Sequence, residues 1–401
     1  MGGNRKGGAM WRLAGTSEGM ELWWDSNPLI YEAWCARFIA SAPQGQQDEL
    51  REELRGMWDA AADPTGWVFK GVTTNPPLTK AVFQDYLKDE GVSIIKDIRR
   101  GNPSLGHQEV AWEAYKEAAR RGARRYLPLF ERSEYRYGYV CAQVDPRLCS
   151  DAPAMVRQAL ELWALEPNIM IKVPASRAGV ATMCILTALG VPTNATLSFT
   201  VPQIMAVARA VRKGKQLGEQ LGTSYAKWRS VITFMVGRFE DAETFRSQAT
   251  EKGIQLTDEM KRWSGIAIAT KACRLLEDGG YPSKLLIASS RVGPTVGGQQ
   301  RIWHIEQLAG RNIVYTMNPE LIQAFMQLYA NLPLENKSNQ DPVPPAVLEQ
   351  LLRVPYFARA YAEDGLREDE FDSLEPFVTT YRQFSGAMTS LESYVQSVLG
   401  A

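Results

Sequence analysis

Lys172 is the residue of this sequence whose surroundings most favour covalent chemistry. It stands in NIMIKVPAS, residues 168–176, where apolar residues flank it on both sides in what reads as a buried strand closed by a proline. Apolar surroundings penalise the charged form of an amine, so its pKa falls and a free nucleophile becomes available for Schiff-base formation. A lysine whose stem lies along a strand end while its ammonium reaches water is the alternative at this stage.

Polar side chains also end the other apolar segments that have the composition of strands. The residues at those ends are Asp25, Asn75, Gln143, Asn194, Thr196, Thr233, Ser289 and Arg291. In a barrel of parallel strands, the carboxyl ends of all strands open on one mouth, where catalytic groups collect. We therefore expect one lysine, one carboxylate and several amides and hydroxyls to converge on a single polar site.

Eight short apolar segments alternate with longer amphipathic ones, and this alternation predicts the fold class. The predicted strands are residues 20–26, 67–75, 137–145, 168–174, 191–199, 229–237, 283–290 and 311–317. Strands that alternate with helices predict a parallel α/β fold, and eight of them favour a closed barrel. We therefore predict a single (β/α)8 TIM-type barrel with extra N- and C-terminal helices.

The predicted barrel domain occupies residues 20–330. Residues 1–19 include basic residues and glycines but lack the apolar run of a signal peptide, and we expect a disordered N-terminal extension there. The region 331–401 is predicted to begin with a polar loop and to continue as C-terminal helices packed on the barrel. The chain is thus expected to hold one domain with extensions at both ends.

The charge balance argues against nucleic acid and membranes as partners. Lys plus Arg and Asp plus Glu number 45 each among 401 residues, and no window approaches the roughly 18 to 20 unbroken apolar residues of a membrane span. Five scattered cysteines without a CxxC pair favour a reduced, cytoplasmic protein. The basic run at residues 119–126 is interpreted as a solvated helix end, with phosphate contact as the alternative.

Histidine is scarce, which argues against metal-dependent and histidine-based catalysis. The only two, His107 and His304, stand in no metal-ligand spacing, and we expect both to be structural. The sequence also lacks the GxxxxGK[ST] phosphate loop and the GxGxxG dinucleotide fingerprint. We predict no metal and no cofactor, so carboxylates, amides and lysine must carry any catalysis.

Six motifs, in order along residues 20–320, resemble the successive barrel-strand motifs of the transaldolases. They are GVTTNPPL, VDPRL, IMIKVPAS, TNATLSF, VITFMVGRFED and LLIASSR. The YTMNPEL stretch and the C-terminal tail resemble the longer bacterial branch of that family. The resemblance implies an enzyme that transfers a dihydroxyacetone unit between phosphorylated sugars. It names neither the acceptor nor the oligomeric state, for which a monomer and a homodimer both remain open.

The resemblance also implies roles for the residues that match the family's motifs. Lys172 matches the Schiff-base lysine, and Asp25 in LWWDS matches the acid/base on the first strand. Asn75 and Asn194 match amides that hold the hydroxyl groups of the donor, although Asn75 before a proline is also typical of a turn. Thr196 matches a threonine that acts on a bound water.

Three further residues match the family's phosphate clamp. They are Arg238 in VGRF and the pair Ser289 and Arg291 in ASSR. Two guanidinium groups offer several planar donors to a phosphate dianion, which explains how a neutral protein can select phosphorylated sugars. A surface ion pair between Arg238 and the acidic residues after it is the alternative.

Two positions depart from the transaldolase pattern. Gln143 stands where transaldolases carry a glutamate, and an amide cannot take a proton from water. The similar fructose-6-phosphate aldolases use a glutamine there together with a tyrosine on the sixth strand. This sequence instead has Met235 at that point, near Thr233, and we expect both to line the substrate site, with core packing as the alternative for Met235.

Three hypotheses for function therefore stand. The first is transfer of dihydroxyacetone between sugar phosphates by a transaldolase. The second, favoured by Gln143, is an aldolase that releases dihydroxyacetone or joins it to an unusual acceptor. The third is a barrel that binds a sugar phosphate without turnover, against which the presence of both Lys172 and Asp25 argues.

Overall fold

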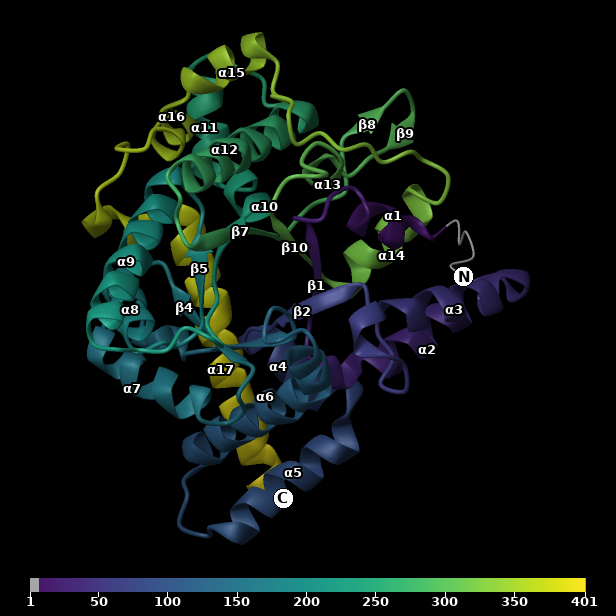
Figure 1. The fold of residues 1–401 in the computed structure, drawn as a ribbon, viewed down its shortest axis with the longest axis vertical. Coiled ribbons are helices and arrows are strands. Elements are labelled where there is room, and N and C mark those ends of the chain that lie inside the picture. The colour runs from purple at the N-terminus through teal and green to yellow at the C-terminus, as the bar shows by residue number, and fades with distance from the viewer. Residues whose placement is uncertain (1–6, 401) are drawn as a thin grey trace.

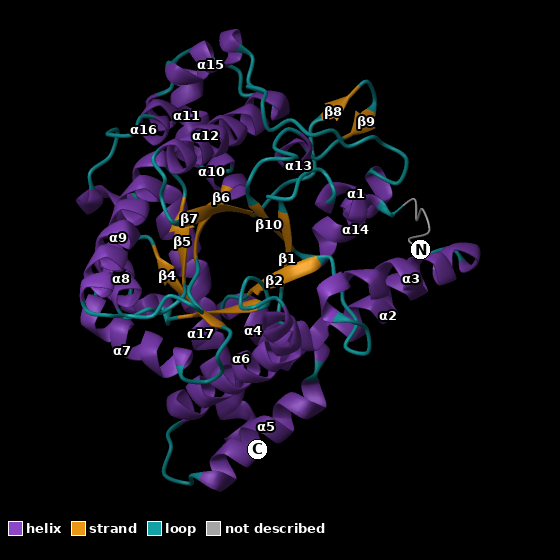
Figure 2. Cartoon of the chain, in the orientation of Figure 1, coloured by secondary structure: helices purple, strands orange, loops and turns teal. Residues whose placement is uncertain are grey.

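The computed structural model describes residues 7–400 and contains a closed barrel of eight parallel strands. The strand order around the barrel is β1-β10-β7-β6-β5-β4-β3-β2, and the strands form the central ring in Figure 2. The strands are β1 (Glu21–Asp25), β2 (Phe69–Thr73), β3 (Tyr139–Gln143), β4 (Ile169–Pro174), β5 (Thr193–Ser198), β6 (Ser230–Met235), β7 (Ser283–Ala288) and β10 (Val314–Met317). Each lies within one predicted segment, so the predicted (β/α)8 barrel is confirmed.

Helices cover the outside of the ring (Figure 2). Those of the first half are α2 (Tyr31–Ser41), α3 (Gln47–Met57), α4 (Pro76–Ala81), α5 (Lys88–Gly101), α6 (His107–Arg132), α7 (Ala152–Trp163) and α8 (Arg177–Ala188). Those of the second half are α9 (Val201–Gln220), α10 (Val236–Glu240), α11 (Glu243–Glu251), α12 (Asp258–Asp278), α13 (Trp303–Glu306) and α14 (Pro319–Leu328). A small hairpin of β8 (Thr295–Val296) and β9 (Gln299–Gln300) lies apart from the barrel.

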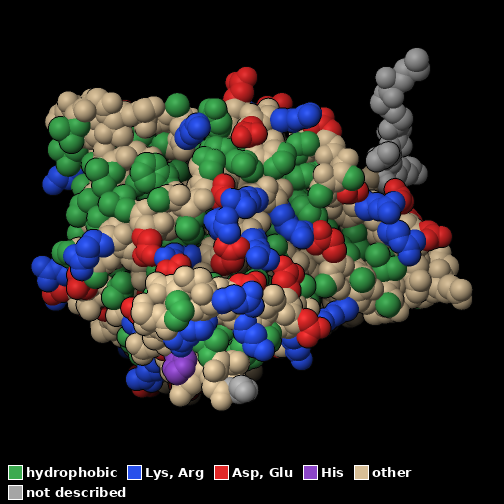
Figure 3. All heavy atoms as spheres, turned by 90° about the horizontal axis from the view of Figure 1, so that it is seen from below, with side chains coloured by type: hydrophobic (Ala, Val, Ile, Leu, Met, Phe, Trp, Pro, Cys, Tyr) green, Lys and Arg blue, Asp and Glu red, His purple; other side chains and the backbone are tan. Residues whose placement is uncertain are grey.

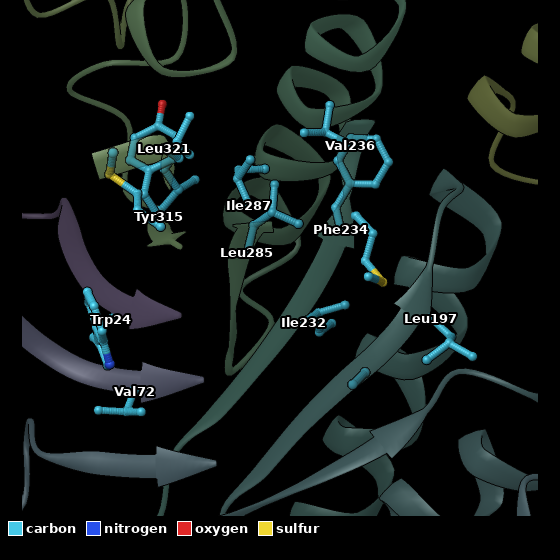
Figure 4. Close-up of a cluster of buried hydrophobic side chains, with 14 of the residues drawn as sticks. Trp24, Val72, Leu197, Ile232, Phe234, Val236, Leu285, Ile287, Tyr315 and Leu321 are labelled. Carbon is cyan, nitrogen blue, oxygen red and sulfur yellow. The ribbon is translucent and has the colours of Figure 1, made fainter. Parts of the chain in front are cut away.

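Alternation along each strand divides its side chains between two layers. Trp24 and Val72 belong to the large core between the barrel and its helices, part of which is shown in Figure 4. Trp23, next to Trp24 in β1, belongs instead to a separate cluster that includes Cys141 of β3 and Met170 of β4. Because side chains alternate along a strand, the residue two positions beyond each of these three faces the same side, the barrel interior. The alternation therefore directs polar side chains into the barrel interior at the carboxyl ends of the strands.

The N-terminal segment differs in part from the disordered extension predicted for residues 1–19. Residues 1–6 lie outside the described residues, but α1 (Ala9–Ala14) is a helix whose Met10 and Leu13 are fully buried. Arg12 ties it to the barrel by donating hydrogen bonds to the carbonyl oxygens of Tyr329 and Ala330. For residues 9–14 the prediction of disorder was therefore wrong, because burial against α14 stabilises a helix too short to persist alone.

The chain after the barrel begins without regular structure and ends in three helices. Residues 331–344 hold no helix or strand, and α15 (Pro345–Leu352), α16 (Pro355–Tyr361) and α17 (Glu375–Gly400) follow. In Figure 1, α17 is the long yellow helix that runs past β5 toward α5. It packs on α4 and α6 and also contacts β5. The last helix is thereby brought to the end of the barrel where the strands finish.

The opposite end of the barrel is held by a buried ion cluster. The carboxylate of Glu21, at the start of β1, accepts hydrogen bonds from Arg229 at 2.5 Å and from Lys284 at 2.8 Å. Burial opposes the charge on Glu21, but the two cations outweigh it and lower its pKa from 4.5 to about 2. This cluster joins β1, β6 and β7 at the end of the barrel opposite the strand ends that carry the predicted site residues.

The surface carries mixed charges. Seen from below in Figure 3, Lys and Arg side chains are interspersed with Asp and Glu. The basic run 119–126 lies within α6, where each of its four arginines pairs with a carboxylate rather than forming a free basic patch. Among residues 7–400, no helix combines the length and the apolar character that crossing a membrane requires.

Candidate active site

A cavity of about 270 Å³ opens where the strands of the barrel end. The predicted site residues that line it are Asp25, Asn75, Lys172, Thr233, Met235, Arg238, Ser289 and Arg291. They come from five strand ends and the loops after them, so the barrel brings together residues up to 266 positions apart in sequence. The other three predicted residues, Gln143, Asn194 and Thr196, are fully buried beside this cavity instead of lining it.

Lys172 lies in the wall of the cavity with its charge poorly solvated. Its side chain is buried, and its Nζ donates a hydrogen bond to the carbonyl oxygen of Thr74 at 3.1 Å. Burial lowers the pKa of the Lys172 amine, and the attraction of Asp25 only partly opposes this shift. The alternative of a lysine that extends into water is therefore wrong, and the environment favours the uncharged, nucleophilic amine.

Asp25 is the carboxylate that faces the same cavity from β1. Thr73 donates a hydrogen bond to its Oδ1 at 2.6 Å, and Thr73 is in turn hydrogen-bonded to Thr316. Burial raises the pKa of Asp25, while Lys172 and the Thr73 hydrogen bond act in the opposite direction. The two groups thus have pKa values displaced toward each other, which is the condition for exchanging protons with a bound substrate.

Asn75 caps a helix and also faces the cavity. Its Oδ1 accepts a hydrogen bond from the backbone N–H of Leu78 at 3.0 Å and caps the N-terminus of α4. The same side chain lines the cavity. Because the oxygen is used by the cap, the amide Nδ2 is the group left to donate to a ligand.

Asn194 is held inside the wall by its neighbours. Thr233 donates a hydrogen bond to its Oδ1 at 2.7 Å, and its Nδ2 lies 3.3 Å from the sulfur of Cys141. Burial raises the pKa of Cys141 to about 11, so this sulfur is a neutral thiol. In β5, Asn194 pairs in register with Lys172 of β4. A displacement of Asn194 would therefore change the surroundings of the amine.

Gln143 stands on the other side of Lys172, with which it pairs in register. The phenol oxygen of Tyr115 holds its backbone by hydrogen bonds of 3.0 and 3.1 Å, yet neither amide atom of its side chain has a protein partner among the described residues. A buried amide normally finds partners, so this side chain is available to water or substrate. Within residues 7–400, the hydroxyl of Thr196 donates its only hydrogen bond to the sulfur of Met235, at 3.9 Å.

The predicted phosphate residues form one side of the cavity. Arg238 donates a hydrogen bond to Thr380 of α17 at 3.3 Å and lies over the ring of Phe384, 5.6 Å from its centroid. Arg291 pairs with Asp241 at 2.9 Å and donates to the carbonyl oxygen of Ser289 at 2.9 Å. The acidic segment after Arg238 thus pairs with Arg291, and the surface ion pair considered for Arg238 was wrong.

Several lining residues were not singled out from the sequence. Thr316 and Asn318 end the eighth strand in YTMNPEL, where the rule used for the other seven strands would have found them. Gln383 and Phe384 belong to α17, and nothing local marks them because their position depends on how this helix crosses the barrel. The C-terminal helix therefore contributes to the site as well as packing on the barrel.

Comparison with known proteins places these observations in a family. Residues 64–373, more than half of the chain, match the family model described as Transaldolase/Fructose-6-phosphate aldolase. Asp25 precedes the matched range, so its place in the site rests on the geometry described above.

Curated relatives agree with the family model. The transaldolase of Thiobacillus denitrificans is 30% identical over 272 residues, which are 63% of this chain and 73% of that protein. The transaldolase of Saccharopolyspora erythraea is 28% identical over 285 residues, which are 67% of this chain and 75% of that protein. The transaldolase of Mycobacterium tuberculosis is 31% identical over 229 residues, which are 55% of this chain and 60% of that protein. The matched range and these relatives together show that the chain belongs to the transaldolase/fructose-6-phosphate aldolase family.

Proposed function

We propose that this enzyme transfers a dihydroxyacetone unit from a ketose phosphate to an aldose phosphate through a Schiff base on Lys172. The observation that carries the proposal is the placement of Lys172 and Asp25 on one cavity, with the pKa of the amine lowered and that of the carboxyl raised. Arg238 and Arg291 border the same cavity and supply positive charge for a phosphate group.

In the proposed reaction, the amine of Lys172 attacks the C2 carbonyl of the donor, and loss of water gives an imine. Asp25 then takes the proton of the C4 hydroxyl while the C3–C4 bond breaks, and the electron pair of that bond passes to the imine to form an enamine. An aldose phosphate leaves. The enamine attacks the carbonyl carbon of the acceptor, Asp25 returns the proton to the new hydroxyl, and water releases the product from Lys172.

Gln143 supports a second candidate, an aldolase that releases free dihydroxyacetone or joins it to an unusual acceptor. Its unengaged amide beside Lys172 can orient a water molecule but cannot take its proton. Met235 lines the cavity and supplies a thioether that donates no proton. Proton handling during imine formation and hydrolysis is therefore the step in which this enzyme is expected to differ from its relatives.

Covalent trapping tests the central step. Borohydride added in the presence of fructose 6-phosphate is expected to reduce the imine and leave the three-carbon fragment on the peptide that contains Lys172, as measured by peptide mass mapping. Lys172→Met removes the nucleophile and is the matched control. An adduct on a different lysine, or equal labelling of the Lys172→Met protein, would rule out the proposed nucleophile.

The two arginines are expected to act on the phosphate group alone. Arg238→Ala and Arg291→Ala should each raise KM for a phosphorylated donor roughly ten- to a hundredfold. This corresponds to a loss of about 1.5 to 3 kcal/mol of binding free energy for one charge-assisted contact. An unphosphorylated analogue should be affected much less. Arg382→Ala provides a control, because this arginine is exposed on α17 and does not line the cavity. Equal losses on both substrates would show that Arg238 and Arg291 have only structural roles.

Gln143→Glu separates the two candidate activities. The substitution gives the water a proton acceptor, and general acid–base assistance is typically worth about 10²- to 10⁴-fold, so we expect faster transfer to erythrose 4-phosphate if proton handling limits turnover. The measurement is the steady-state rate of transfer and of dihydroxyacetone release, with and without the acceptor. Release without acceptor in the wild-type protein favours the aldolase. A change of less than about threefold in both rates would show that Gln143 does not control the chemistry.

A further inference from the structure

His304 lies outside the cavity but is hydrogen-bonded to both segments that carry its phosphate-binding residues. The first segment is α10, which carries Arg238 and ends at Glu240, and the second is the loop after β7, which carries Ser289 and Arg291. The imidazole is fully buried. Its Nε2 lies 2.6 Å from Oε1 of Glu240, and its Nδ1 accepts a hydrogen bond from the backbone N–H of Arg291 at 3.1 Å.

These two contacts fix the protonation state of His304. A backbone N–H can only donate, so Nδ1 must carry a lone pair, and the carboxylate of Glu240 can accept the single proton on Nε2. Burial first, and then the charges of Arg262 and Arg291, lower the pKa of His304 well below 6.5. The ring is therefore neutral near pH 7 and has the one tautomer that satisfies both partners.

The partners of His304 are themselves held in place. Arg262 of α12 binds the other carboxylate oxygen of Glu240, and a Cβ at Gly265 would lie 2.4 Å from Oε1 of Glu240. From the barrel, the phenol of Tyr315 donates to the carbonyl oxygen of His304 at 3.2 Å. The Glu240 carboxylate and the backbone of His304 are thus both anchored by other elements. We therefore expect the imidazole to be held rigidly between α10 and the loop after β7.

The two segments also touch directly at Gly237. A Cβ there would lie 2.2 Å from the carbonyl oxygen of Ser289 and 2.9 Å from Cγ of Arg291. Ser289 has a φ of 61°, in the left-handed region that non-glycine residues seldom adopt. The loop after β7 is therefore held against α10 in an unfavourable conformation, and interactions from outside the loop must maintain it.

We propose that His304 is a positioning residue that fixes the loop after β7 against α10 by accepting the hydrogen bond of the Arg291 backbone at Nδ1, while its hydrogen bond to Glu240 selects the tautomer that offers this acceptor. It touches no reacting atom. The inference rests on the proposed phosphate site and adds to it a requirement for an acceptor at the Nδ1 position. Loss of that acceptor frees the Arg291 backbone and weakens phosphate binding without removing a charge.

Two substitutions separate this role from ordinary core packing. In His304→Asn the side-chain oxygen replaces Nδ1 and keeps an acceptor for Arg291, whereas in His304→Gln the amide replaces Nε2 and keeps a donor for Glu240. We expect His304→Gln to raise the Kd for inorganic phosphate, measured by calorimetry, roughly three- to tenfold, and His304→Asn to stay within about twofold of the wild type. KM for the phosphorylated donor should follow the same order, with kcat nearly unchanged. Equal effects of both substitutions would overturn the proposal.

Arg291→Ala, measured in the same experiment, distinguishes an error in the proposed phosphate site from an error in the proposed role of His304. If Arg291→Ala binds phosphate like the wild type, the phosphate site is wrong and the role of His304 is lost with it. If Arg291→Ala binds weakly while both His304 variants bind normally, the positioning role alone is wrong.

Nitrogen-15 NMR of the wild-type protein provides a readout that needs no variant of His304 to fold. With only two histidines in the chain, His107→Gln assigns the remaining signal to His304. The proposal predicts an unprotonated Nδ1 at pH 7 whose resonance shifts as inorganic phosphate saturates the site. A proton on Nδ1, or a resonance that phosphate does not move, would contradict it.

Discussion

The site depends on keeping an amine and a carboxyl group together in a poorly solvated cavity. Burial acts on both groups in the direction of the neutral form, since it lowers the pKa of Lys172 and raises that of Asp25. Their mutual attraction opposes this effect without cancelling it. A cavity that was more open to water would bring the pKa of the lysine back toward 10.5 and reduce the share of free amine, so the proposed mechanism depends on the closed barrel and on the helix α17 beside its mouth.

Different strands of the barrel position the residues that surround the amine and the carboxyl group. Lys172, Gln143 and Asn194 sit at paired positions of three neighbouring strands, so the ladder sets which side chains flank the amine. Asp25 comes from β1, which lies three strands away from β4 in the closed strand order. In the proposed mechanism, the acid and the nucleophile are thus placed by different strands, and the substrate carbons lie between them. The ion cluster at Glu21 stabilises the far end of the barrel, away from Lys172 and Asp25.

Much of this arrangement was predictable because the signals are local. An apolar segment that ends in a polar residue marks both a strand and the group it delivers to the mouth, as in the segments that end at Asp25 and Lys172. Helix α1 was missed because six residues beside glycines are marginal as a helix until they pack on α14. The positions of Phe384 beside the cavity and of His304 beside Glu240 could not be predicted for the same kind of reason. Their partners, Arg238 and Glu240, are far away in sequence, and only the folded chain brings them together.

The claim on which the account depends is that burial lowers the pKa of Lys172 and so increases the share of its uncharged amine near neutral pH. Its titration can be followed directly by carbon-13 NMR of the lysine ε-carbons, with Lys172→Met identifying the resonance. The account predicts a midpoint clearly below the ordinary value of 10.5, so that the free amine is lost only as the pH falls through this lowered pKa. A midpoint at or above 10.5 would mean that the lysine is a stable cation paired with Asp25, and the proposed nucleophile would be excluded.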